Sequence, residues 1–431
     1  SVNDSASKVR DLIGGGIICA DGGSEECGPE LAKFLAENRG ITTDTIGFAL
    51  DGGSNEGARD YLKDIATKGG GSFSEASSQE ELTSIFTDIL VDATKKSKTF
   101  VTAGVAVNSF NRLNHQDELY FSLFKPAVEP LWRGNLKRYK LNVEEDADGS
   151  IKTEIIGEND VPAVNEDTGF FDDAVRSWWS SDADGSDVTL GGAANQLDED
   201  NSKRKVYTYL GVLTPPGDPK PLTAKITASN ALITKSLLDI TDEDDAYRIK
   251  LINWIRGVDV SDSDGDKDLT DGRQEMMDPL HSSPHIVTYS GTADSSKNTI
   301  FYGENQGYLH AIDGDNGEER FAFMPASMLE KQKILYNNEP ADDHPYGLDG
   351  SVTSWVNDID GNGIIDGKDH VYIYIGMRRG GNNYYALDVT SPDSPKWLWG
   401  IEGGTGKFSE LGQSWSQPVH TKIRIDTKEM N

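Results

Sequence analysis

The spacing of apolar residues changes near residue 98 and divides the chain into two parts. Before it, apolar residues recur at helical spacing over 31–39, 58–68 and 78–90, and apolar runs typical of strands lie between them over 42–50 and 71–76. Ser78 and Glu81 have the spacing of a capping box at the start of the third helix. Because helices and strands alternate, residues 1–97 are predicted to form an α/β domain with a parallel sheet.

After residue 98 the pattern becomes that of a mostly β region. Short runs with strand character, such as 99–107, 118–126 and 205–213, are separated by turns rich in Gly, Pro and Asp. A single helix is predicted over 242–257, where acidic residues at the start suit the helix dipole. The acidic stretch 144–200 is read as loops, and its two D-A-D-G-S segments as turns. We therefore predict a β-rich region over 98–258.

Two similar units follow, over 299–323 and 370–400. Each contains a strand ending in Gly (Gly303, Gly376), a polar turn, an aromatic-x-Ala-apolar-Asp segment and an aromatic strand. Glycine and aromatic motifs that recur in each hairpin are typical of propeller blades. Since two repeats cannot close a ring, residues 259–431 are predicted to be the first blades of a quinoprotein-like β-propeller. The overall fold class is thus mixed.

A calcium-type loop joins these units. Oxygen-bearing side chains stand at its positions 1, 3, 5, 9 and 12, namely Asp358, Asp360, Asn362, Asp366 and Asp369. Gly363 at position 6 permits a sharp turn, and Ile364 at position 7 offers its backbone carbonyl. A run of Asx turns on an acidic surface is the alternative. We favour calcium, Ca2+, and because a strand follows the loop, we expect the ion to fix a loop on a β-scaffold.

A second acidic loop precedes the repeats and has no clean register. Starting at Asp262 places Lys267 at the glycine position, whereas starting at Asp264 places Leu269 there. Converging aspartates nevertheless need a counter-charge. A second calcium site is therefore predicted, with its ligands drawn from Asp262, Asp264, Asp266, Asp268 and Asp271.

The charge balance limits the partners. The 431 residues carry a formal net charge of −31. Nucleic acid is not expected as a partner, because its phosphates need a basic surface. No apolar run reaches the roughly 18 residues of a membrane span, so no transmembrane segment is predicted. No signal peptide opens the chain, and a signal is expected to have been removed or to lie upstream of Ser1.

The two cysteines, Cys19 and Cys27, are eight positions apart. This spacing allows either a loop disulfide or two reduced thiols, and no further zinc ligands lie near them. A disulfide is favoured, because cation loops and acidic β-modules suit an exported protein.

The first ninety residues resemble the second half of a von Willebrand factor A domain. The resemblance rests on the order of the strand TIGFAL, a helix, the segment GGGSF and a final helix. Such domains bind a metal through an Asp-x-Ser-x-Ser loop near their start, and that loop does not occur here. We therefore expect the chain to begin inside the domain and assign no metal to it.

Several stretches, in order from about Thr99 to Trp415, resemble the PilY/PilC family of type IV pilus tip-associated proteins. They include VNSFNRLNHQDELYFSLFKP, PLWRGNLKRYKL, INWIRGVD, DPLHSSPHIV and GMRRGGNNYYALDVT. The resemblance implies an extracellular protein of the pilus tip or cell surface, exported through the periplasm, with a propeller. It also implies calcium binding through a loop of the type that Asp358, Asp360, Asn362 and Asp366 match.

The function implied by this resemblance is that of an adhesin and pilus biogenesis factor. Family members promote pilus assembly and extension, and the resemblance implies roles in surface attachment and twitching motility. The implied partners are minor pilins at the tip of the pilus (fimbrium) and a host or abiotic surface ligand. Because no Arg-Gly-Asp tripeptide occurs in the sequence, integrin-like binding is not expected.

Two other functions stay open. Pyrroloquinoline quinone alcohol dehydrogenases resemble the chain in blade sequence and bind calcium, but they use adjacent cysteines beside the cofactor, whereas Cys19 and Cys27 lie far upstream of the blades. A calcium-dependent, lectin-like adhesin would share the cation loop. The histidines, among them His281, His285 and His310, show no nucleophile–base arrangement and are read as structural. The chain is therefore predicted not to be an enzyme.

Overall fold

The protein forms two compact units, Ser1–Ser97 and Lys98–Asn431, each taken by itself below. The computed structural model describes residues 27–39, 41–50, 55–79, 81–83, 85–86, 89, 100–107, 115–145, 149–165, 171–200, 202–213, 218–263, 265–292, 295–341 and 343–421. No helix in these ranges is both long enough and apolar enough to cross a bilayer.

The smaller unit has the predicted alternation of helices and strands. Its elements are α2 (Gly28–Arg39), β1 (Thr43–Phe48), α3 (Glu56–Lys68) and β2 (Gly70–Ala76). β1 and β2 pair in parallel, as a crossover helix between them requires, and α3 contacts both strands and α2. Ser78 caps the N–H of Glu81 as predicted (3.2 Å to Oγ), whereas Glu81 Oε2 accepts the N–H of Ser77 (2.7 Å), one residue before the N-cap of an ideal capping box. The relation to von Willebrand factor A domains stays a prediction.

Cys27 lies at the start of the smaller unit. It is buried and disulfide-bonded. The predicted partner, Cys19, lies outside the described residues, so the pairing itself stays a prediction.

The larger unit contains three five-stranded sheets, none of which closes within the described residues. One sheet has the order β10 (His285–Thr292), β11 (Ser295–Gly303), β12 (Leu309–Asp313), β13 (Glu319–Phe323) and β7 (Val206–Tyr207). The second has the order β14 (Thr353–Asn357), β15 (His370–Gly376), β16 (Tyr384–Asp388), β17 (Lys396–Ile401) and β8 (Lys220–Pro221).

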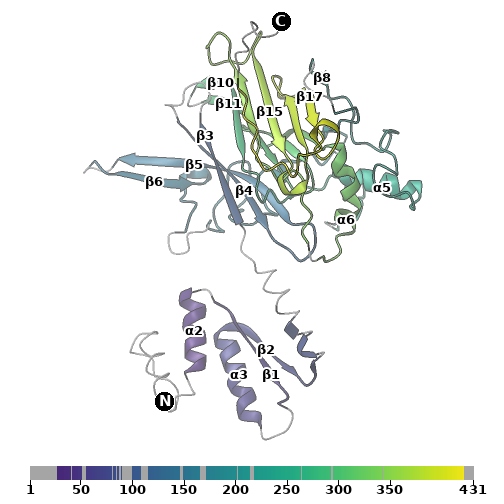
Figure 1. Ribbon diagram of the computed structural model, residues 1–431. Coiled ribbons are helices and arrows are strands. Elements are labelled where there is room, and N and C mark those ends of the chain that lie inside the picture. Colours follow the sequence, from purple (N-terminus) through teal and green to yellow (C-terminus); the bar gives the residue numbers. More distant parts are fainter. Residues whose placement is uncertain are drawn as a thin grey trace. The chain divides into compact units, whose positions relative to one another are not determined.

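The third sheet has the order β3 (Phe100–Val107), β4 (His115–Lys125), β5 (Arg133–Glu145) and β6 (Ile151–Ile156), with β9 (Met276–Met277) also paired to β5. The β5–β6 hairpin extends beyond the other strands of this unit (Figure 1). Two helices, α5 (Asp245–Arg256) and α6 (Gln332–Asn337), contact each other and lie side by side (Figure 1). Five 3₁₀ helices complete the described elements: η3 (Glu158–Asp160), η4 (Ala194–Gln196), η5 (Ala326–Lys331), η6 (Arg378–Gly380) and η7 (Gly406–Phe408).

Each of the first two sheets contains a four-stranded antiparallel meander. The predicted repeats supply the last three strands of each meander, and the first strand, β10 or β14, precedes the repeat. The outer edge of each meander is covered by a short strand from the segment 206–221, since β7 pairs with β13 and β8 with β17. The predicted boundary at residue 258 therefore does not separate two compact units. Val206, Ile226 and Leu251 share one hydrophobic core with Phe323 and Trp397. The identification of these sheets as propeller blades stays a prediction.

The apolar alternation of β15 explains its place in the sheet. Val371, Ile373 and Ile375 are buried in the shared core, whereas Tyr372 and Tyr374 pack with tryptophans in a cluster on the other side. With apolar contacts on both faces, β15 is held as a central strand of its sheet.

Candidate functional site

The candidate metal site lies in the loop that joins β14 to β15. One carboxylate oxygen from each of Asp358, Asp360 and Asp369 lies within 4.8 Å of the other two. The loop thus brings its first, third and twelfth positions together. Three converging carboxylates repel one another and favour a cation between them.

The backbone of the loop orients the first of these carboxylates. The N–H groups of Gly361 and Gly363 donate to Asp358 Oδ1 (2.7 Å) and Oδ2 (2.9 Å), and both glycines have positive φ (71° and 79°). The Gly363 N–H is the main cause of the lowered pKa of Asp358. The loop therefore favours the ionised form of this carboxylate, which is the form that binds a cation.

The far end of the loop is anchored by Asp369, which is 5% exposed. Its carboxylate accepts the N–H groups of Ile359 (2.9 Å) and Asp366 (3.0 Å). The Ile365 N–H donates to the Tyr289 carbonyl of β10 (2.8 Å), which ties the loop to the neighbouring sheet.

The remaining predicted ligands are placed differently. Asn362 lies beside Asp360, since its Nδ2 donates to Asp360 Oδ2 (3.1 Å). Asp366 is exposed, and its carboxylate is not in the cluster of three. The Ile364 side chain is exposed, as expected for a residue that would contribute only its carbonyl. No basic side chain in the described part of the chain forms an ion pair with the three clustered carboxylates.

The second acidic loop is arranged otherwise. Among its described aspartates, no three carboxylates gather as a metal group would, and Asp264 lies outside the described residues. Asp262 instead accepts the Lys267 N–H (2.8 Å), and Asp268 accepts the N–H and hydroxyl of Thr270 (2.8 and 2.6 Å). Lys267, which occupies the glycine position, has a positive φ of 72°. These bonds cap local turns, so the described geometry gives the second predicted site (Asp262, Asp266, Asp268 and Asp271) no support.

A different acidic loop encloses a cation that sequence reasoning missed. The Lys137 ammonium contacts the carbonyls of Asp184 (2.7 Å), Gly185 (3.0 Å) and Asp187 (2.7 Å), and lies 3.0 Å from Asp184 Oδ2. The side chains of Lys137 and Asp184 are both buried. The sequence predicts only a turn for this D-A-D-G-S segment. Lys137 lies on β5, 47 positions before Asp184, and no local sequence pattern connects the lysine with the turn.

The histidines named from the sequence contact carboxylates or hydroxyls. His310 is buried between Glu304 (3.2 Å) and Glu319 (2.7 Å), and Glu319 also binds Arg204 (2.7 Å). Although burial lowers the pKa of His310, the two carboxylates raise it to about 9. His281 lies 2.7 Å from Asp349, and His285 Nε2 lies 2.8 Å from Ser354 Oγ. These contacts agree with structural roles.

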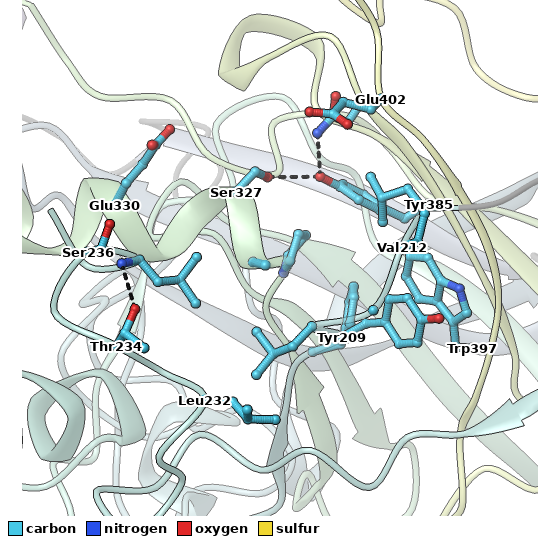
Figure 2. A pocket seen from close by; sticks show the side chains of 18 residues that line it. Tyr209, Val212, Leu232, Thr234, Ser236, Ser327, Glu330, Tyr385, Trp397 and Glu402 are labelled. Carbon is cyan, nitrogen blue, oxygen red and sulfur yellow. Dashed lines mark hydrogen bonds between the residues drawn. The ribbon is translucent and has the colours of Figure 1, made fainter. Parts of the chain in front are cut away.

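A pocket of about 690 Å³ opens between the first two sheets. Figure 2 shows side chains around it from separate parts of the chain, including Tyr209, Leu232, Ser327 and Trp397. Tyr209 stacks on Trp397 with ring centroids 4.1 Å apart. Ser327 Oγ lies 2.8 Å from the Tyr385 hydroxyl, which also accepts from Asn383 Nδ2 (2.9 Å). Nothing in the sequence pattern indicated this pocket, because its walls come from distant segments.

Comparison with known proteins finds the chain similar to type IV pilus biogenesis factors. No family model matches it. It is 31% identical over 149 residues to the type IV pilus biogenesis factor PilY1 of Pseudomonas aeruginosa strain UCBPP-PA14, a match that covers 34% of this chain and 12% of that protein. It is 36% identical over 139 residues to a PilY1 homologue of Xylella fastidiosa strain Temecula1, a match covering 30% of this chain and 9% of that protein.

A solved structure is also similar in sequence. The Pseudomonas aeruginosa PilY1 C-terminal domain is 32% identical, over 28% of this chain and 22% of that one, with a TM-score of 0.21. The likeness therefore rests on sequence identity rather than on superposition. The matches span about a tenth of the length of the curated relatives.

Proposed function

Because this chain belongs to the PilY1 family, we propose that it acts in type IV pilus biogenesis as a non-enzymatic, calcium-stabilised module of the cell surface or pilus tip. The observation that carries the calcium part is the cluster of Asp358, Asp360 and Asp369, whose carboxylates converge without a basic partner in the described chain.

The donor set fits calcium. Its atoms are carboxylate oxygens, joined by the amide oxygen of Asn362 and the carbonyl of Ile364 as further candidate ligands. Calcium takes six to eight such oxygens at about 2.3–2.6 Å and tolerates irregular geometry, whereas zinc prefers nitrogen and sulfur. Water would complete the shell. Asp366 and the second acidic loop are left out of the proposed site.

The proposed ion would act on the sheet rather than on a substrate. Asp358 follows the end of β14, and Asp369 precedes the start of β15. A cation that holds these residues together closes the connection between the two paired strands. Loss of the ion would open the loop and loosen that edge of the sheet.

The proposed role in adhesion follows from the family. A calcium-fixed surface would contact minor pilins or a host or abiotic surface, and so support pilus extension, attachment and twitching motility. No feature of the described structure favours the quinone-dependent dehydrogenase or the lectin-like alternative over this role.

The test replaces Asp358 and Asp360 by Asn in the native host, with Asp266→Asn/Asp268→Asn as a control of equal charge. We expect the first pair to reduce surface piliation, twitching and attachment, and the control pair to leave all three unchanged. Calorimetry on the purified proteins should show calcium binding by the control but not by Asp358→Asn/Asp360→Asn. Unchanged piliation, together with quinone-dependent alcohol oxidation by the wild type, would refute the proposal.

A further inference from the structure

The pocket between the first two sheets has a feature that neither calcium nor the family explains. Its described lining includes two exposed acidic residues, Glu330 and Glu402, and no lysine or arginine. Figure 2 shows the two glutamates on different sides of Ser327, whose hydroxyl lies near that of Tyr385. The rest of the lining combines aliphatic and aromatic side chains with hydroxyl and amide groups. A ligand that fills this space meets negative charge next to apolar surface.

The mouth of the pocket is also apolar. Val212 is 76% exposed and Leu232 is 69% exposed, and both line the cavity. Large apolar side chains left this open beside a cavity are typical of a surface that a partner covers. The volume of about 690 Å³ lies within the range of pockets that bind compact ligands or a few side chains.

Trp397 and Tyr385 do not offer an open ring face on which a sugar could stack. Trp397 and Tyr385 are each only 2% exposed, and Tyr209 covers one face of Trp397. The buried polar groups are paired with one another, since Ser327 and Asn383 both bind the Tyr385 hydroxyl. The groups that a ligand can reach are therefore the carboxylates, the aliphatic side chains and the exposed hydroxyl residues Thr234 and Ser236.

We propose that this pocket binds an extended polypeptide segment in which a lysine or arginine is flanked by apolar residues. The basic group pairs with the carboxylates of Glu330 and Glu402 through charge-assisted hydrogen bonds. The flanking side chains cover Val212 and Leu232. The net charge of −31 speeds the approach of such a segment.

The test measures fluorescence anisotropy of the labelled peptide acetyl-Leu-Val-Lys-Val-Leu-amide, and of its Arg, Gln and Glu counterparts, with the whole chain. The Lys and Arg peptides should bind saturably, and the Gln and Glu peptides at least about tenfold more weakly. Glu330→Gln and Glu402→Gln should each weaken the Lys peptide about fivefold or more. Glu410→Gln, an exposed acid that does not line the pocket, should change its affinity by less than about twofold. Leu232→Ser should weaken the Lys and Gln peptides by similar factors, because it removes apolar contact rather than charge.

Several results would overturn the proposal. Equal binding of the Lys and Gln peptides would show that charge is not read, and an equal loss in Glu410→Gln would show non-specific attraction. Displacement of the peptide by maltotriose would identify a glycan site. Absence of saturable binding by both basic peptides at millimolar concentration would also contradict it. None of the aspartates of the β14–β15 loop lines the pocket, so the outcome is independent of the calcium proposal.

Discussion

Two acidic loops of the larger unit differ in whether a basic side chain neutralises their converging oxygen atoms. The loop at 182–187 surrounds the Lys137 ammonium with three carbonyls and one carboxylate, so its cation belongs to the chain. The loop at 358–369 brings three carboxylates together, and none has a basic partner among the described residues. Both have aspartates at alternate positions, yet only the first is neutralised by the protein itself.

The difference shows how a lysine can replace a metal ion in a turn. Asp184 is also held by Ser177 and Ser180, whose hydroxyls donate to Oδ2 at 2.7 and 2.9 Å. Burial lowers the pKa of Lys137, and the Asp184 carboxylate opposes that shift. A paired ammonium fixed on a strand stays in place at any calcium concentration. We expect a loop without such an ammonium to respond to the concentration of free calcium.

The largest effect is expected from removing the internal cation. Lys137→Met should lower the free energy of unfolding by about 3–5 kcal/mol, because it leaves the Asp184 carboxylate buried and unpaired. Urea denaturation at pH 7 measures this change. Lys152→Met, at an exposed position on β6, is the control and should shift the midpoint little.

The double variant Lys137→Met/Asp184→Asn sharpens this test. Removal of the negative charge should recover part of the lost stability, since the uncompensated charge is then gone. A single variant as stable as the wild type would show that the ammonium is not needed to neutralise the loop.

The buried charges around His310 extend the comparison to pH. The pKa of His310 is raised to about 9, above the unfolded value of about 6.5. Its contribution to stability is therefore complete below pH 6.5 and declines as the pH rises to 9, by roughly 3 kcal/mol. Urea midpoints at pH 6.5, 7.5 and 9 should fall in the wild type. They should fall less in His310→Gln, which starts from lower stability, and parallel pH profiles would contradict the assignment.

The effect expected next in size is that of calcium. Binding to the folded state should raise the free energy of unfolding by roughly 2.7 kcal/mol at a hundredfold excess over the Kd. Thermal unfolding with calcium and with EDTA measures the difference. Asp369→Asn should remove the response to calcium, and Lys137→Met should retain it because the proposed calcium site does not include its loop. A response that persists in Asp369→Asn would place the ion elsewhere.

Local patterns predicted what depends on nearby residues. The meander strands follow from alternating apolar residues. The helix α5 begins after a capping aspartate, Asp244, which accepts the Tyr247 N–H, and ends at a glycine, Gly257, with a φ of 100°. The carboxylates at positions 1, 3 and 12 of the β14–β15 loop converge, as their spacing indicated. In each case the decisive contacts lie within a few residues or across one hairpin.

Long-range contacts were the ones missed. β7 and β8 are two-residue strands that pair with β13 and β17, more than a hundred positions later, and nothing in their own sequence specifies a partner. Lys137 is one of several basic residues on β5, beside Arg138 and near Lys140, so the local sequence gives no sign that it alone serves as a buried cation. The acidic loops at 262–271 and 358–369 are similar in amino-acid composition, so composition alone does not distinguish them. At the position where the 358–369 loop has a glycine, the 262–271 loop has Lys267, and its aspartates cap local turns.

The smallest effect is expected at this second acidic loop, and it tests whether spacing or composition decides calcium binding. Asp266 is exposed, and its Oδ1 accepts the Asp268 N–H (2.6 Å), a bond that an asparagine oxygen can also accept. Asp266→Asn should therefore change the Tm by less than about 2 °C in EDTA, as surface substitutions usually do. It should also keep the full response to calcium, because its carboxylate belongs to no described group of three. Asp369→Asn, which removes one charge in the same way, should lose that response. Equal loss in both variants would show that calcium senses the overall acidity of the unit rather than the geometry of the β14–β15 loop.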